Sequence, residues 1–268
     1  MSAFASSPLG ARAPFGGRRF GYLVNVVFYD QVSSTNDFAK SIAEPLLADG
    51  TEIPPTVIVA RRQTAGRGRG SRSWVSAGNT GLSFSLILPW PEGPERVRLP
   101  LRLGVILARG LTGKYGVEVR LKWPNDLLAG RKKLGGILVE ARAGPEGEGY
   151  AVAGIGLNVS TTRAALDAAG LREATSLAEA GAAPAALAGD AVLVAVLAEL
   201  DAGLSAPAFD LPAAFAAVSA HREGERLTIV ENGRQTAGTF LGVTADGFLR
   251  LGTSGGEETV VSGDIASF

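Results

Sequence analysis

The sequence contains no cysteine and a single histidine, His221, among its 268 residues. Without thiols the chain forms no disulfide, has no cysteine nucleophile and cannot build a zinc–thiolate site. A serine–histidine pair or a multi-histidine metal site is disfavoured too, because each needs a well-placed imidazole and His221 lies in an expected turn between two domains. We interpret His221 as structural. The absence of cysteine suits a reducing compartment, so we expect a cytoplasmic protein.

The chain also lacks an excess of charge of either sign, since 26 Lys and Arg residues balance 26 Asp and Glu residues. No overall positive field therefore draws it to nucleic acid or to a membrane. Residues 1–20 contain no apolar run of signal-peptide length, and no later run reaches membrane-spanning length without charge. With 46% apolar residues the chain can bury a large core. We expect a soluble protein that binds neither DNA nor a membrane.

What the sequence does have is a glycine- and arginine-rich stretch, Gln63–Trp74, directly after an apolar run that predicts a strand. Glycines alternate in it with arginines: Gly66, Gly68 and Gly70; Arg67, Arg69 and Arg72. Glycine lets the backbone take positive φ, and guanidinium groups beside backbone amides suit an anion such as phosphate. Trp74 adds a flat apolar face on which a purine can stack. A flexible connection or an RNA-binding tail is the alternative, but the position between two predicted strands favours a phosphate loop.

A second polar block is Lys122-Trp123-Pro124-Asn125-Asp126, and Lys132 and Lys133 follow it across an expected hairpin. Asn125 and Asp126 carry oxygen atoms of the kind that Mg²⁺ prefers beside phosphate. A lysine ammonium in a partly closed site stabilises the negative charge that builds when a carboxylate attacks phosphorus. The alternative is a strand-ending turn with Trp123 in the core and solvated lysines. Spacing alone does not choose between Lys132 and Lys133.

Upstream, Ser34-Thr35-Asn36 lies between a predicted strand and a predicted amphipathic helix, where it either caps the helix or contacts a small polar ligand. Together the three blocks predict activation of a carboxylic acid by ATP. The acid itself attacks the α-phosphate, so the first step needs no side-chain nucleophile, and an amine can capture the mixed anhydride afterwards.

The order of the patterns predicts an α+β fold, a mixed sheet flanked by helices, with a small C-terminal β-barrel. Strands are expected at 22–29, 56–61, 82–88, 117–121, 127–129, 134–143 and 150–159. Helices are expected after residue 37, over 101–115 following Pro100, and across the Ala- and Leu-rich region 161–220. Short strands at 226–230, 235–243, 248–251 and 259–262 predict the barrel. We expect a flexible segment at 1–20, a catalytic domain at 21–221 and the barrel at 222–268.

Five blocks in this order resemble the ordered motifs of biotin–protein ligases: Ser34–Asn36, Gln63–Gly70 with Trp74, Lys122–Asp126, Lys133–Glu140 and Gly154–Asn158. The resemblance spans residues 22–180 and the C-terminal barrel. It implies a class II synthetase-like sheet with an SH3-like barrel, and a reaction in two steps. Biotin and MgATP give biotinyl-5′-AMP and pyrophosphate, and a lysine of a biotin carboxyl carrier domain, such as that of acetyl-CoA carboxylase, then takes the biotinyl group.

The resemblance also implies roles by position. The expected biotin contacts are Ser34, Thr35, Gln63, Gly66, Arg67, Arg69, Lys133 and Gly136. The expected ATP or adenylate contacts are Arg67, Arg69, Trp74, Asn125, Lys133 and Asn158. Lys133 and Arg67 are the expected catalytic residues, and Asp126 is the expected Mg²⁺ ligand.

Three other functions remain open at this point, of which an enzymatically inert, biotin-binding interaction protein is the least favoured because the set of residues around Lys133 is intact. A lipoate–protein ligase is the nearest, although the Lys122–Asp126 block argues against it. A nucleic-acid binding module that uses the arginines and Trp74 is the third, and zero net charge argues against that. The sequence departs from the larger bifunctional ligases because no winged-helix domain precedes Tyr22, so we expect no repressor activity. The resemblance allows a monomer or a homodimer.

Overall fold

The computed structural model describes residues 20–266 apart from 76–79, 91–92, 94, 145–146, 189, 208 and 232. The expected flexible segment therefore lies outside the described residues, except for Phe20. The elements are β1 (Asn25–Val32), α1 (Thr35–Ala48), β2 (Thr56–Gln63), β3 (Gly81–Pro89), α2 (Glu95–Tyr115), β4 (Val119–Lys122), β5 (Asp126–Ala129), β6 (Lys132–Ala143), β7 (Gly149–Asn158), α3 (Arg163–Ala168), η1 (Pro184–Leu187), α4 (Ala191–Ser205), α5 (Leu211–Val218), β8 (Arg226–Glu231), β9 (Arg234–Val243), β10 (Leu249–Thr253), β11 (Gly256–Val260) and β12 (Asp264–Ile265).

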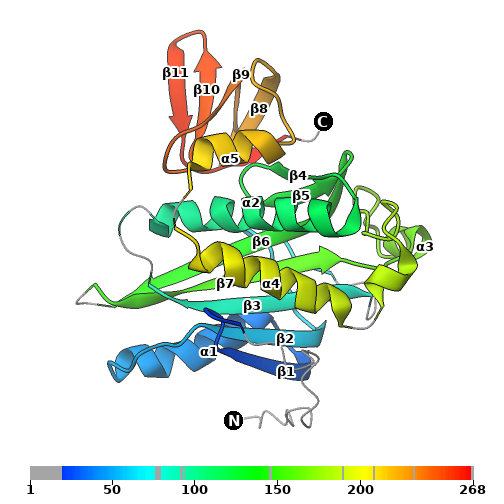
Figure 1. The fold of residues 1–268 in the computed structure, drawn as a ribbon. Coiled ribbons are helices and arrows are strands. Elements are labelled where there is room, and N and C mark those ends of the chain that lie inside the picture. Colours follow the sequence, from blue (N-terminus) through cyan, green and yellow to red (C-terminus); the bar gives the residue numbers. More distant parts are fainter. Residues whose placement is uncertain are drawn as a thin grey trace.

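Strands β1 to β7 form one mixed sheet in the order β1-β2-β3-β7-β6-β5-β4 (Figure 1). Only β1 and β2 run parallel, and every other neighbouring pair is antiparallel. The sheet carries a helix layer on each face because alternate residues of a strand point to opposite faces. Val57 and Val59 belong to the large core that includes α2 and α4, whereas Ile58 packs in a smaller core beneath α1. The predicted mixed sheet flanked by helices is confirmed.

Several predicted boundaries differ from the structure, among them that of the last strand, which was expected at 259–262 and is β11 at Gly256–Val260. Two further differences have a clear physical reason. The first strand begins at Asn25 rather than Tyr22, because the backbone N–H groups of residues 21–23 donate to the Asp201 carboxylate at 2.8–2.9 Å instead of pairing in the sheet. Helix α2 begins at Glu95 and includes Pro100, which the sequence placed just before it. The Glu95 carboxylate accepts hydrogen bonds from Arg98 and Arg102, which hold this first turn.

The C-terminal strands form an antiparallel sheet in the order β11-β10-β9-β8-β12. Within the described residues this sheet is open, with β11 and β12 at its edges, so the expected closed barrel is not observed. The sheet packs on the end of the larger one near α2 and α5 (Figure 1). Its apolar residues share the core that contains α2, and Trp123 Nε1 donates to Gly247 O at 3.0 Å. The expected division at residues 221 and 222 stays a prediction.

The helices of the described ranges are all too short or too polar to cross a membrane.

Candidate active site

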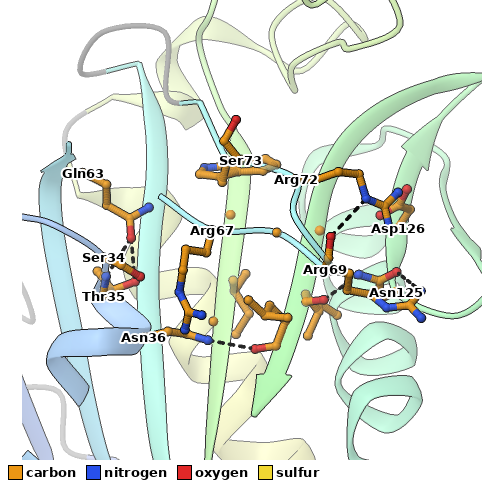
Figure 2. A pocket seen from close by; sticks show the side chains of 18 of the residues that line it. Ser34, Thr35, Asn36, Gln63, Arg67, Arg69, Arg72, Ser73, Asn125 and Asp126 are labelled. Carbon is orange, nitrogen blue, oxygen red and sulfur yellow. Dashed lines mark hydrogen bonds between the residues drawn. The ribbon is translucent and has the colours of Figure 1, made fainter. Parts of the chain in front are cut away.

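An open cavity lies where α1, the Gln63–Trp74 stretch and strands β5 to β7 meet (Figure 2). All the predicted site residues line it except Gly66 and Asn158. Binding sites for small molecules usually combine apolar walls with a few polar groups. The fold therefore gathers into one cavity residues that are more than 100 positions apart in the chain.

The Gln63–Trp74 stretch is an ordered loop that folds back on itself. Trp74 N donates to Gly66 O at 2.9 Å, and Gly68 N donates to Arg72 O at 2.8 Å. Gly70 makes the turn with a φ of 61°, which a residue with a side chain rarely adopts. A Cβ at Gly66 would lie 2.4 Å from Trp74 O, so Gly66 is needed for closing this loop. The loop is thus closed by its own backbone hydrogen bonds, and two of the alternating glycines are needed for that closure.

Trp74 packs against the middle of β7. A Cβ at Gly156 would lie 2.3 Å from the Trp74 ring, so the indole can approach the strand only because residue 156 is glycine. This confirms that the small residues of 154–158 permit close approach. The Trp74 Nε1 atom is buried and has no hydrogen-bond partner among the described residues.

One end of the cavity is a buried network of uncharged polar groups. Gln63 Oε1 accepts hydrogen bonds from Thr35 N at 2.7 Å and Thr35 Oγ1 at 3.1 Å. Ser85 Oγ lies 2.8 Å from Thr35 Oγ1 and 2.7 Å from Asn36 Oδ1. Ser34 starts helix α1 but makes no side-chain capping bond, so the capping interpretation is wrong for this residue. Sequence reasoning missed Ser85, although a polar residue inside the apolar strand at 82–88 was the available signal.

The network continues from Asn36 into a charged cluster. Glu140 accepts hydrogen bonds from Asn36 Nδ2 at 2.8 Å, from Lys40 Nζ at 3.0 Å and from the Arg67 guanidinium. Arg67 also contacts Asp37 at 2.8 Å. Burial pushes the pKa of Glu140 upward, but its bonds to Arg67, Asn36 and Lys40 outweigh it and hold that pKa below its usual value. Arg67 is thereby fixed with its guanidinium toward α1, at the inner end of the loop (Figure 2).

The opposite side of the cavity carries an ion pair. Lys133 Nζ lies 2.6 Å from Asp126 Oδ1. A Cβ at Gly136 would lie 3.3 Å from Lys133 Cε, so this glycine leaves room for the lysine stem. Lys132 is exposed and does not line the cavity, which resolves the choice between the two lysines in favour of Lys133 as the cavity residue.

Asn125 and two arginines complete this side. Asn125 Nδ2 donates to Ile137 O at 2.7 Å, and its Oδ1 lies 3.5 Å from Arg69 Nη1. Arg69 Nη1 also donates to Asp264 Oδ1 at 2.8 Å, and Arg72 Nη2 donates to Asp264 Oδ2 at 2.8 Å. Sequence reasoning counted Arg72 among the arginines of the phosphate loop without assigning it a contact, and it gave no role to Asp264.

The residues present fit a magnesium site only in part. Asp126 has the lysine ammonium as its partner, and the described ranges contain no group of three or more His, Cys, Asp or Glu side chains that could hold a metal ion. Magnesium commonly takes one or two carboxylates and completes its shell with phosphate oxygens and water. Asp126 fits a site of that kind, in which one carboxylate acts together with phosphate and water, and it does not fit a site made of protein ligands alone.

Asn158 lies outside the cavity. Its side chain is buried, and Nδ2 donates to Thr175 O at 2.9 Å. Leu177 N in turn donates to Asn158 O at 3.1 Å. Asn158 thus holds the segment after α3 against β7, and the geometry gives no support to the expected contact with ATP.

Comparison with known proteins agrees with this architecture. Residues 28–158 match the Biotin/lipoate A/B protein ligase family, and residues 224–266 match the Biotin protein ligase C terminal domain. The chain is 37% identical over 149 residues to the bifunctional ligase/repressor BirA of Bacillus spizizenii, covering 53% of this chain and 44% of that protein. It is 34% identical over 156 residues to a biotin–[acetyl-CoA-carboxylase] ligase of Mycobacterium tuberculosis, covering 56% of this chain and 54% of that protein. The matches thus span about half the length of these relatives.

The structural comparison extends further along the chain. The biotin protein ligase from Aquifex aeolicus in complex with biotin and ATP superposes with a TM-score of 0.71 at 25% identity, over 90% of this chain and 97% of that one. Both family matches occur in the expected order, and the fold follows that of a ligase through both sheets. The chain belongs to the biotin protein ligase family.

Proposed function

We propose that the protein is an ATP-dependent biotin–protein ligase, which activates biotin to biotinyl-5′-AMP and transfers it to a lysine of a biotin carboxyl carrier domain. The observation that carries this proposal is the cavity that the Thr35–Gln63 network, the Gly-Arg loop (Gln63–Trp74) and Lys133 line together. The names of the relatives, which include a ligase for acetyl-CoA carboxylase and a ligase with biotin and ATP bound, support the same assignment.

In the first step, a carboxylate oxygen of biotin forms a bond to the α-phosphorus of ATP, and the bond from that phosphorus to pyrophosphate breaks. Negative charge grows on the phosphate oxygens in this transition state. The Lys133 ammonium stabilises it, and Asp126 at 2.6 Å keeps the ammonium in place. Mg²⁺, bound through Asp126 and the phosphates, would supply further neutralisation.

The loop and the polar end of the cavity would hold the two substrates. The buried Thr35 and the half-buried Gln63 offer a set of donors and acceptors to the polar head of biotin. Trp74 offers the face of its indole that points away from β7 to the adenine ring. In the second step, the carrier amine attacks the biotinyl carbonyl, and AMP leaves with the electrons of the broken anhydride bond.

The finer assignments belong to the same proposal. We infer roles for Lys133 and Arg67 in catalysis, for the Gly-Arg loop in holding biotin and the adenylate, and for Asp126 toward magnesium. The cytoplasm is the proposed compartment, because a ligase of this kind needs ATP and an intracellular carrier. The acceptor carries its lysine on a separate protein, and the ligase acts as a monomer or a homodimer.

The test is biotin-dependent exchange of labelled pyrophosphate into ATP, run beside lipoate and a control without acid. Exchange with biotin alone is the expected result. Exchange with lipoate instead would make the protein a lipoate–protein ligase, and exchange with neither acid would overturn the proposed enzyme activity. Transfer of biotin to a purified carrier domain then tests the second step.

A further inference from the structure

One carboxylate of the C-terminal sheet reaches the Gly-Arg loop. Asp264, on β12, accepts hydrogen bonds from Arg69 through Oδ1 and from Arg72 through Oδ2, both at 2.8 Å. The bonds join residues that are 195 and 192 positions apart. Two guanidinium groups of one loop are therefore held by the two oxygens of one carboxylate.

The backbone around Asp264 is firmly anchored. Asp264 and Ile265 pair with Val230 and Ile229 of β8, and the Ile265 side chain is buried in the main core. Gly263 enters the strand with a φ of 133°, and its carbonyl oxygen accepts a further bond from Arg69 at 3.1 Å. A side chain at residue 263 would also crowd Ile229 and Val230. The carboxylate thus extends from a rigid base toward a loop that is tied mainly through its own backbone.

These bonds occupy only part of each guanidinium group. Arg69 uses Nη1 for its contacts with Asp264, Gly263 and Asn125. Arg72 uses Nη2 toward Asp264 and Nε toward Arg69 O at 3.2 Å. Both arginines line the cavity, so the N–H groups that these bonds do not use can still donate to a phosphate. Asp264 orients the two cations without saturating them.

We propose that Asp264 is a positioning residue of the active site, which holds the Gly-Arg loop closed and aligns Arg69 and Arg72 for the nucleotide phosphates. The C-terminal sheet then contributes directly to the geometry of the cavity. The part of this proposal that concerns nucleotide binding rests on the proposed function, whereas the part that concerns loop closure does not.

The first test follows loop closure in the ligand-free protein by amide hydrogen exchange of a peptide covering residues 64–74. In Asp264→Ala, the bonded amides of Gly68 and Trp74 should exchange about fivefold faster than in the wild type, the factor expected when a partly exposed ion-pair network is lost. Exchange equal to that of the wild type would overturn the positioning role.

Asp246→Asn is the matched control. Asp246 also belongs to the C-terminal part of the chain, and it pairs with Arg98 of α2 at 3.3 Å. Its side chain is 45% exposed, against 43% for that of Asp264. It does not line the cavity, so its loss should leave exchange in residues 64–74 unchanged. Faster exchange in both variants would show that any loosening of the C-terminal sheet opens the loop, and it would overturn a specific role of Asp264.

The second test measures pyrophosphate exchange at varied ATP. Asp264→Ala should raise KM for ATP about fivefold and change kcat less, and Asp264→Glu should recover part of that loss, since a carboxylate is restored. A lower KM for ATP in Asp264→Ala would overturn the proposal, because it would mean that Asp264 competes with phosphate for the two arginines. If the wild type shows no exchange with biotin, the proposed function fails, and the hydrogen-exchange result still decides the loop-closing role.

Discussion

The two ends of the cavity fix their polar groups in different ways. At the inner end, Thr35, Asn36 and Ser85 are at most 4% exposed, and each polar group has a hydrogen-bond partner within the network. At the outer end, Arg69, Lys133 and Asp126 are between 23% and 38% exposed and are held by ion pairs between separate elements. Figure 2 shows Thr35 and Asn36 on one side of the cavity and Asp126 on the other.

The difference follows from the cost of burial. A buried polar group that loses its partner is strongly unfavourable, so the inner network is tied to the stability of the fold. Partly exposed ion pairs contribute little to stability, and their groups can exchange partners when a ligand arrives. We therefore expect substitutions at the outer end to change the rate of the reaction, and substitutions at the inner end to change the free energy of unfolding.

The largest expected effect is on chemistry at the outer end. Lys133→Ala should slow biotin-dependent pyrophosphate exchange about 100-fold or more, since it removes a charge that stabilises the transition state. Its midpoint of urea unfolding should stay close to the wild-type value, because Lys133 is partly exposed. Lys132→Ala is the control and should retain activity. An active Lys133→Ala beside an inactive Lys132→Ala would show that the wrong lysine has been assigned.

The next effect is on stability at the inner end. A Cβ at Gly154 would lie 2.1 Å from Asn36 Oδ1, so Gly154→Ala should displace that amide and lower the free energy of unfolding by about 1–3 kcal/mol. Urea unfolding measures this loss. The control is Gly113→Ala in α2, where a Cβ meets nothing within 4 Å, and this helix substitution should be neutral or stabilising. Unchanged stability in Gly154→Ala would contradict the division between the two ends.

The smallest expected effect is a dependence on pH. Because the pKa of Glu140 is held below its usual value of 4.5, its charged form stabilises the fold above that pH, and the contribution disappears as the pH falls through the lowered pKa. Glu140→Gln should thus lose less unfolding free energy than the wild type between pH 7 and about pH 3.5. The exposed Glu52 provides the control, since Glu52→Gln should keep the wild-type acid dependence. Identical acid profiles for wild type and Glu140→Gln would mean that the cluster around Arg67 adds nothing to stability.

Some features of the site could be predicted because their causes are local. The turn at Gly70 needs positive φ, and the small residues near Gly156 allow an aromatic ring to approach, so both were visible in the sequence. Lys122–Asp126 and Lys133 could be placed beside one another because a short hairpin joins them. By contrast, the capping role of Ser34, the start of α2 and the contact of Asn158 were misjudged, because sequence periodicity does not show which groups a side chain bonds or how far a helix extends before an internal proline.

The sequence by itself determined the chemistry that this protein can perform: it excluded thiol and multi-histidine sites, and it supplied the ordered blocks of arginine, lysine, asparagine and aspartate. Only the tertiary structure decided which of these groups meet. Periodicity and turn preferences act over a few residues, whereas the pairing of Glu140 with Arg67, or of Asp264 with Arg69 from 195 positions away, depends on strand order and on how the two sheets pack. The loop can be predicted from the sequence, whereas the residues that it contacts are decided by the fold.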